Sequence, residues 1–312
     1  MSNFIIAVNS VLPLFLIISA GFVARRAGLL EEAWLGKLNR FTFVALLSVK
    51  LFWSVYTSDF QSGLHGGLMT FIIVSTLVSY AVIYILVVLL KKDNAKRGVM
   101  IQALYRSNFI ILGVPIAVAL AGERCEGVAS AIAAVAVPLG NALAVFTLQR
   151  FSDNYAGWGG LVKKICTNPL ILGTLAALLV RVVGIRLPAP VASATSSMAA
   201  AATPVALLVL GGFFHLEDLK GRWKDLSICL IGKLLLIPVV MLSIAVALGF
   251  RGADLAIILA YFAAPCGPTS YTMAREIGGD TALVSGTVVL GSICSAATLT
   301  VLSFLLMQLG YL

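Results

Sequence analysis

The chain is a succession of long apolar runs, and nearly all of its charged side chains fall between them. A helix that crosses a bilayer needs about 20 mostly apolar residues, because its backbone polar groups must bond within the helix. Ten runs of about this length lie at residues 3–24, 35–56, 68–90, 98–120, 127–149, 165–185, 191–213, 226–248, 253–275 and 281–308. The pattern predicts an all-α polytopic membrane protein with ten transmembrane helices, numbered here spans 1 to 10.

The amino-acid composition excludes the classes of soluble protein. Hydrophobic residues make up 60% of the chain and charged residues 11%, where a soluble domain carries about 25% charged residues. A net charge of +9 would suggest nucleic acid in a soluble protein, but no basic stripe interleaved with aromatics occurs, so no nucleic-acid partner is expected. The connecting loops are too short to hold an enzyme. Two histidines in predicted loops and five scattered cysteines without a CxxC motif predict neither a metal site nor a cofactor.

The positions of Lys and Arg predict the orientation of the chain, because cytoplasmic loops of membrane proteins are rich in these residues. Cations follow the odd-numbered spans: Arg25, Arg26, Lys37, Arg40, Lys91, Lys92, Lys96, Arg97, Arg150, Lys163, Lys164, Lys220, Arg222, Lys224 and Arg275. The opposite side carries Arg124, Arg186 and Arg251. We therefore expect a multi-pass protein of the plasma (inner) membrane with both termini on the non-cytoplasmic side.

The sequence also matches itself at a shift of 156 residues, half of its length. The shift pairs Pro13 with Pro169, Ala20 with Ala176, Gly28 with Gly184, Tyr105 with Tyr261, and Gly122 with Gly278. Each half, 1–156 and 157–312, holds five spans, so the second half must be inverted relative to the first. Inverted repeats of this kind are typical of secondary transporters.

The fourth span of each half contains glycines and prolines that predict a broken helix. Span 4 contains Gly113 and Pro115, and span 9 contains Pro265, Gly267 and Pro268. Proline removes a backbone donor and clashes with the preceding turn. The simpler alternative at each position is a proline kink. Matching positions in the two halves favour two discontinuous helices that cross near the midplane, where transporters of this kind bind substrate.

Polar residues flank both predicted breaks. Ser107 and Asn108 precede the one in span 4, and Thr269 and Ser270 follow the prolines of span 9. The Asn108 amide has two possible roles, satisfying freed backbone groups or meeting a substrate carboxylate. We also expect half-helix N-termini near residues 114–116 and 268–270, whose free N–H groups favour an anion.

The charges inside the spans are all positive. The 13 acidic residues lie in or next to predicted loops, whereas Lys50, Arg106, Arg181 and Lys233 lie within spans. An ionisable side chain inside a membrane is functional by default. Lys50 lies near the middle of span 2, where pairing with a backbone carbonyl or a lipid phosphate is the alternative. Arg181 and Lys233 are closer to helix ends and can snorkel to the surface. These charges predict an anionic substrate, most simply a small carboxylate.

Several of these segments resemble the auxin efflux carrier family in its bacterial branch. The matching motifs are Leu38-Asn39-Arg40, Ser107-Asn108-Phe109, Gly113-Val114-Pro115, Thr203-Pro204, Gly211-Gly212, Ala264-Pro265 and Ala274-Arg275-Glu276. The resemblance covers all ten spans in order. Plant members of this family export auxin, a carboxylate, and bacterial members are associated with malonate, malate and similar acids.

The resemblance implies a fold and a mechanism. Spans 1, 2, 6 and 7 would form a scaffold, often a homodimer, and spans 3–5 and 8–10 a transport bundle that moves as an elevator. The substrate-binding residues would be Lys50, Arg106, Ser107, Asn108, Gly113, Pro115, Pro265, Gly267, Pro268 and Thr269, of which Asn108 matches the family's substrate-contacting asparagine. Where the family has a proline in span 2 this chain has Ser48, with Lys50 two residues on, so substrate identity does not follow from the resemblance.

Two other transporter classes stay open from the sequence. A sodium-coupled symporter of the bile-acid type shares crossed helices, and a ten-span drug/metabolite exporter shares the length and the inverted repeat. The exporter would have cytoplasmic termini, which the cation distribution opposes. No cofactor is expected, and the coupling ion, H⁺ or Na⁺, is not indicated.

Overall fold

The computed structural model describes residues 2–57, 66–123, 125–153, 155 and 157–312, and all regular elements within these residues are helices. Seven helical segments of this part are long and apolar enough to cross a membrane: Glu32–Thr57, Gly66–Leu90, Asn94–Ala121, Cys125–Phe151, Ala189–Phe213, Trp223–Ala247 and Thr281–Gln308. A bent pair, Gly157–Cys166 and Pro169–Val182, makes an eighth if it is one span. The chain is therefore a multi-pass membrane protein, as its composition predicts.

The first half contains α1 (Ser2–Arg26), α2 (Glu32–Phe41), a π-helical turn η1 (Thr42–Leu46), α3 (Leu47–Thr57), α4 (Gly66–Leu90), α5 (Asn94–Tyr105), a second π-turn η2 (Phe109–Gly113), α6 (Val114–Ala121) and α7 (Cys125–Phe151). The second half contains α8 (Gly157–Cys166), α9 (Pro169–Val182), α10 (Ala189–Phe213), a 3₁₀ turn η3 (Leu216–Leu219), α11 (Trp223–Ile231), a third π-turn η4 (Gly232–Leu236), α12 (Ile237–Ala247), α13 (Gly252–Ala263), α14 (Thr269–Ile277) and α15 (Thr281–Gln308).

The range predicted for span 6, residues 165–185, differs from the structure. One helix covers only Pro169–Val182, and α8 before it is bent away by 53°. Asn168 caps α9 by accepting a hydrogen bond from the Leu170 N–H at 3.0 Å. Pro169 has no N–H to continue the preceding helix and is favoured at a helix start. These two residues separate α9 from the amphipathic α8.

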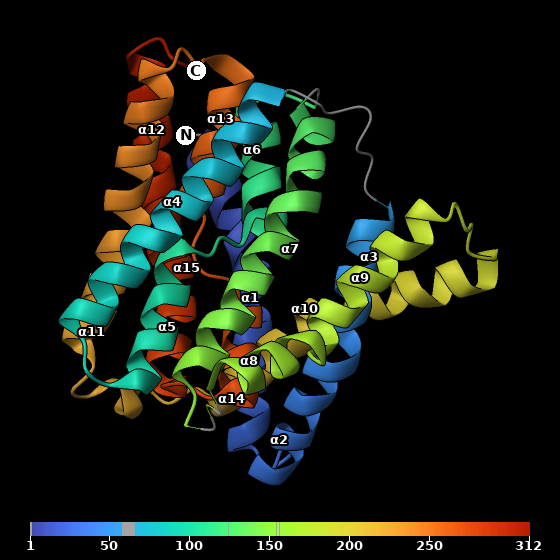
Figure 1. The fold of residues 1–312 in the computed structure, drawn as a ribbon. Coiled ribbons are helices and arrows are strands. Elements are labelled where there is room, and N and C mark those ends of the chain that lie inside the picture. The colour runs from blue at the N-terminus through green and yellow to red at the C-terminus, as the bar shows by residue number, and fades with distance from the viewer. Residues whose placement is uncertain (1, 58–65, 124, 154, 156) are drawn as a thin grey trace.

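The helices pack in two groups. In one, α1 packs on α10, and α3 packs on both α9 and α10. In the other, α5 packs on α4 and α7, and α13 packs on α6, α12 and α15. The first group includes α3 and α9, which project to one side of the molecule in Figure 1. The two ends of the chain lie at the same end of the second group (Figure 1).

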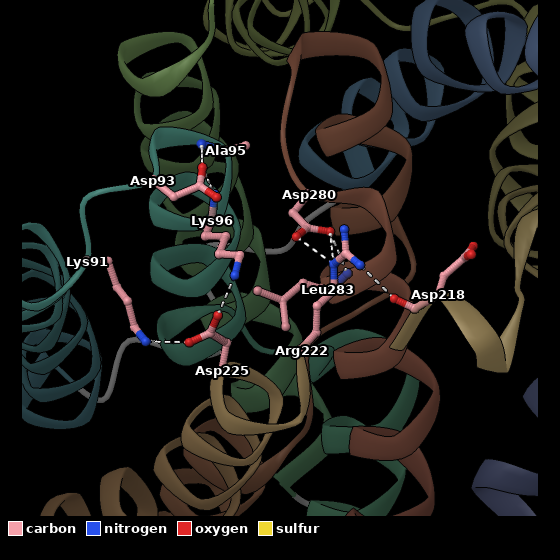
Figure 2. Close-up of polar contacts among 9 residues, drawn as sticks. All are labelled: Lys91, Asp93, Ala95, Lys96, Asp218, Arg222, Asp225, Asp280 and Leu283. Carbon is pink, nitrogen blue, oxygen red and sulfur yellow. Dashed lines mark hydrogen bonds and ion pairs between the residues drawn. The ribbon is translucent and has the colours of Figure 1, made fainter. Parts of the chain in front are cut away.

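Charged side chains join α4, α5, α11 and α15 at the opposite end of the second group (Figure 2). Asp225 on α11 accepts hydrogen bonds from Lys91, just beyond α4, and from Lys96 on α5, the latter at 3.0 Å. Arg222 donates to both carboxylate oxygens of Asp280 at 2.9 and 2.8 Å, and Asp280 also caps α15. The Asp225 side chain is only 9% exposed. This cluster holds four helices of the group together.

Asp225→Asn is expected to lower the melting temperature of the detergent-purified protein by several degrees. The substitution removes the charge that two partly buried lysines share, and a hydrogen bond to a charged group contributes about 1.5–3 kcal/mol. A matched control is Asp153→Asn, because Asp153 is exposed. Equal melting temperatures for the two variants would show that the cluster does not stabilise the bundle.

Candidate functional site

Two helices of the second group are interrupted, and the two interruptions touch. α5 ends at Tyr105 and η2 begins at Phe109, while α13 ends at Ala263 and α14 begins at Thr269. Between them the chain is not helical, with Arg106 extended at φ −71° and ψ 146°. The Asn108 N–H donates a hydrogen bond to the Pro265 carbonyl at 2.8 Å. The breaks predicted in spans 4 and 9 therefore meet.

The break in the first half lies earlier than the sequence predicts. It covers residues 106–108, and Pro115 lies within the first turn of α6, so the expected half-helix N-terminus at 114–116 is wrong. The reason is the π-turn η2, in which the Val114 N–H bonds to the Phe109 carbonyl five residues back. Such a turn widens the helix, so it accommodates the ring of Pro115 without ending the helix. The helix N-terminus at the crossing is instead at residues 109–111.

Gly113 and Pro115 do not line the cavity at this crossing. Gly113 allows η2 to approach α13, since a Cβ there would lie 2.9 Å from the Ala260 carbonyl oxygen and 2.4 Å from the Phe109 ring. Pro115 is exposed. Pro265 is buried and contributes its carbonyl to the crossing. The structure thus gives Gly113 a role in the packing of η2 on α13 and Pro265 a role in the crossing, and it places Pro115 outside both.

A cavity of about 70 Å³ lies between α3 and the two breaks. The predicted residues that line it are Lys50, Arg106, Ser107, Asn108, Gly267, Pro268 and Thr269. Two further polar residues line it that sequence reasoning missed, Ser54 on α3 and Asn141 on α7. The signal for Asn141 is present in the sequence, because it is an amide inside an otherwise apolar run.

Asn108 lies between the two breaks with its amide donor unused. The residue is 8% exposed, and its Nδ2 has no hydrogen-bond partner among the described residues. A buried amide without a partner costs free energy comparable to a lost hydrogen bond. Gly267 of the other break packs against it, since a Cβ at that position would lie 3.3 Å from the Asn108 Oδ1. The packing leaves a donor for which the described residues supply no acceptor.

Arg106 connects both breaks to α7. Its Nη2 donates to Asn141 Oδ1 at 2.6 Å and to Thr269 Oγ1 at 3.0 Å, and its Nη1 contacts Met273 Sδ at 3.1 Å. The residue is 9% exposed. No described Asp or Glu forms an ion pair with it. Its positive charge is thus solvated by neutral groups alone.

Lys50 reaches the same cavity from the other group of helices. It belongs to α3, and its Nζ donates to the Thr203 hydroxyl on α10. Like Arg106, it forms no ion pair with a described acidic residue. Two cations from different helix groups therefore face one cavity. Among the described residues, His, Cys, Asp and Glu side chains do not gather in threes as a metal site requires.

The comparisons with known proteins agree with this architecture. A family described as "Membrane transport protein" matches residues 6–151 and 159–303. A protein of Methanothermobacter thermautotrophicus described as an "uncharacterized transporter" is 22% identical over 303 residues, which cover 96% of this chain and 98% of that protein. Because the family match extends over nearly the whole sequence, the chain belongs to the membrane transport protein family, the auxin efflux carrier family that its motifs resemble.

Proposed function

We propose that this protein is a secondary transporter of small organic anions, mono- or dicarboxylates of the malonate or auxin kind, which bind where the two broken helices cross. The observation that carries the proposal is the buried and unpartnered Nδ2 of Asn108. A substrate carboxylate oxygen is an acceptor of the kind this donor lacks.

The charge around the cavity supports an anion. Arg106 and Lys50 line it without a described acidic partner. The first N–H groups of η2, at residues 109–111, lie at a helix N-terminus and have no acceptor within the helix. Ile110 and Ile111 of that turn line the cavity, so the positive end of the helix dipole also faces it. An amide, two cations and a helix N-terminus are complementary to a carboxylate.

The proposed architecture has ten spans in two inverted halves, 1–156 and 157–312. The helix ends support it, because they recur at the 156-residue shift found in the sequence. α1 ends at Arg26 and α9 at Val182; α3 ends at Thr57 and α10 at Phe213; α6 ends at Ala121 and α14 at Ile277. The paired glycines Gly28 and Gly184 after α1 and α9 also share a positive φ, 74° and 75°.

The packing supports an elevator mechanism with a scaffold of spans 1, 2, 6 and 7. These spans correspond to α1, α2–α3, α9 and α10, most of which pack on one another, while spans 3–5 and 8–10 form the other group. The cavity lies between Lys50 of the scaffold and the breaks of the bundle. A sliding movement of the bundle would carry Asn108 and Arg106 past Lys50. In this proposal the scaffold spans also form the homodimer that the resemblance implies.

We place the protein in the plasma (inner) membrane with both termini on the non-cytoplasmic side. The cations of the cluster in Figure 2 then face the cytoplasm, in agreement with the distribution of Lys and Arg. Reporter fusions at the two termini test this orientation. Cytoplasmic signals from both fusions would favour a drug/metabolite exporter instead.

The proposal predicts selective stabilisation of the purified protein by carboxylates. Malonate, malate and indole-3-acetate at saturating concentration should raise the melting temperature, since a ligand at 100 times its Kd stabilises by about 2.7 kcal/mol. Malonamide is the matched control, because it has the shape of malonate without its charge. Stabilisation by malonamide equal to that by malonate would contradict the anion site, as would no stabilisation by any carboxylate.

A further inference from the structure

A third cation lies inside the bundle, away from the cavity. Lys233 is the second residue of η4 and is 3% exposed. Its distance to the helix end would let the side chain snorkel toward the membrane surface. The side chain turns inward instead, and its Nζ donates to the Phe262 carbonyl at 3.0 Å. Lys233 does not line the cavity that holds Asn108.

The acceptor of this hydrogen bond is an end carbonyl of a broken helix. α13 ends at Ala263, so Phe262 is among its last four residues, whose carbonyls have no N–H partner within the helix. The C-terminal end of a helix also carries the negative end of its dipole. In transporters with broken helices, such half-helix C-terminal ends coordinate the coupling cation. Here an ammonium group of the chain itself occupies this position.

The surrounding residues fix Lys233 in place. η4 is a π-turn, in which the Ile237 N–H bonds to the Gly232 carbonyl, and Pro238 follows in the first turn of α12. Gly232 packs closely on α5, since a Cβ there would lie 2.5 Å from Leu104 Cδ2. No described acidic residue forms an ion pair with Lys233. The carbonyl at the end of α13 is therefore the polar partner that the structure gives to this charge.

The other break also carries a buried cation. α5 ends at Tyr105, and the next residue, Arg106, carries a guanidinium that is buried at the crossing. Its Nη2 donates to Asn141 and Thr269, whereas Lys233 donates to an end carbonyl of a half-helix. One of these side chains faces the cavity, and Lys233 is held apart from it.

We propose that Lys233 is a tethered cation that takes the place of a coupling Na⁺ at the end of α13, so that transport needs no sodium at the crossing. This inference rests on the proposed transport function. It selects against the sodium-coupled symporter, because a cation site already filled by an ammonium has no room for a mobile ion. Its function is to neutralise the end of α13 in every state of the transport cycle.

The first test needs neither substrate nor transport. Melting temperatures of the purified full-length protein are measured in NaCl, KCl, methylammonium chloride and choline chloride at equal ionic strength. We expect the wild-type protein to melt at the same temperature in NaCl and KCl. Lys233→Ala should melt at a lower temperature, and Na⁺ or methylammonium, which fit the vacated space, should restore part of the loss where choline does not. Lys92→Ala, at an exposed lysine, is the control.

Two outcomes of this experiment would overturn the proposal. One is selective stabilisation of the wild-type protein by Na⁺, which would indicate a separate sodium site. The other is an equal melting temperature of the Lys233→Ala variant in all four salts. Because no carboxylate is present, neither outcome depends on the proposed substrate. Failure of the proposed transport function would appear separately, as the absence of stabilisation by carboxylates.

Flux measurements provide a second test that does not rely on the alanine variant folding well. Wild-type proteoliposomes should take up carboxylate equally with Na⁺ or K⁺ in the medium. Lys233→Met keeps an apolar stem of similar length and removes the charge, and we expect its flux to fall at least about tenfold, as for the loss of a buried charged hydrogen bond. Wild-type flux in Lys233→Met, or sodium-dependent flux in the wild type, would contradict the proposal.

Discussion

Replacing Asn108 by alanine is expected to lower carboxylate flux by about tenfold or more. The Asn108 Nδ2 is buried and has no described partner, so the variant removes a donor that, in the proposed site, binds the substrate alone. A hydrogen bond to a charged acceptor contributes about 1.5–3 kcal/mol, which corresponds to about ten- to a hundredfold in affinity. The measurement is malonate or malate uptake by proteoliposomes that contain equal amounts of protein.

The stability of this variant separates binding from folding. Because Asn108→Ala removes an unsatisfied buried amide, its melting temperature without substrate should equal or exceed that of the wild type. The stabilisation by malonate should disappear. Asn94→Ala, at an exposed asparagine at the start of α5, is the matched control and should transport normally. Undiminished flux through Asn108→Ala would remove this residue from the binding site.

Lys50→Leu is expected to weaken carboxylate binding by about tenfold with a smaller effect on the maximal rate. Lys50 reaches the cavity from α3, where its Nζ donates to the Thr203 hydroxyl and no described acidic residue forms an ion pair with it. A charge near a partly buried site contributes about 1–2 kcal/mol to the binding of an opposite charge. The measurement is the concentration dependence of uptake, which separates affinity from rate.

Charge is distinguished from shape by Lys50→Arg. Arginine keeps the positive charge and reaches a similar distance, so most of the affinity should remain in this variant. An affinity in Lys50→Leu equal to that of the wild type would leave the anion preference to Arg106 and the η2 N-terminus. A loss that is equal in both variants would indicate that the shape of the lysine, and its contact with Thr203, matters more than its charge.

The sequence predicted the break in the second half more accurately than the one in the first. Pro265, Gly267 and Pro268 lie within the non-helical segment between α13 and α14, and Thr269 begins α14. In the first half the same type of motif, Gly113 and Pro115, lies inside a helix. The two cases differ in the hydrogen bonds of the preceding turn. A π-turn accepts a proline that an α-turn would not, and residue type alone does not specify which turn forms.

The sequence also does not predict in which direction the buried charged side chains point. Lys233 and Arg181 both lie near the ends of apolar runs, and both can snorkel. In the structure Lys233 turns inward to the Phe262 carbonyl, and Arg181 donates to the Val55 and Tyr56 carbonyls of α3. The apolar residues surround these helices on nearly all sides, so the periodicity that reveals the buried face of a soluble helix is weak here. The rotation of each helix is therefore not encoded locally.

The amino-acid sequence by itself determined that the chain is helical, embedded in a membrane and related to a transporter family. The bilayer requires each spanning segment to be apolar, helical and of a certain length. These features can therefore be predicted from each segment alone, without knowledge of tertiary contacts. Only the tertiary structure decided which polar groups meet. Lys50 of α3, Arg106 and Asn108 of the break between α5 and η2, and Thr269 of α14 line one cavity. Their meeting depends on how the helices pack, and packing between distant segments is a property of the whole fold.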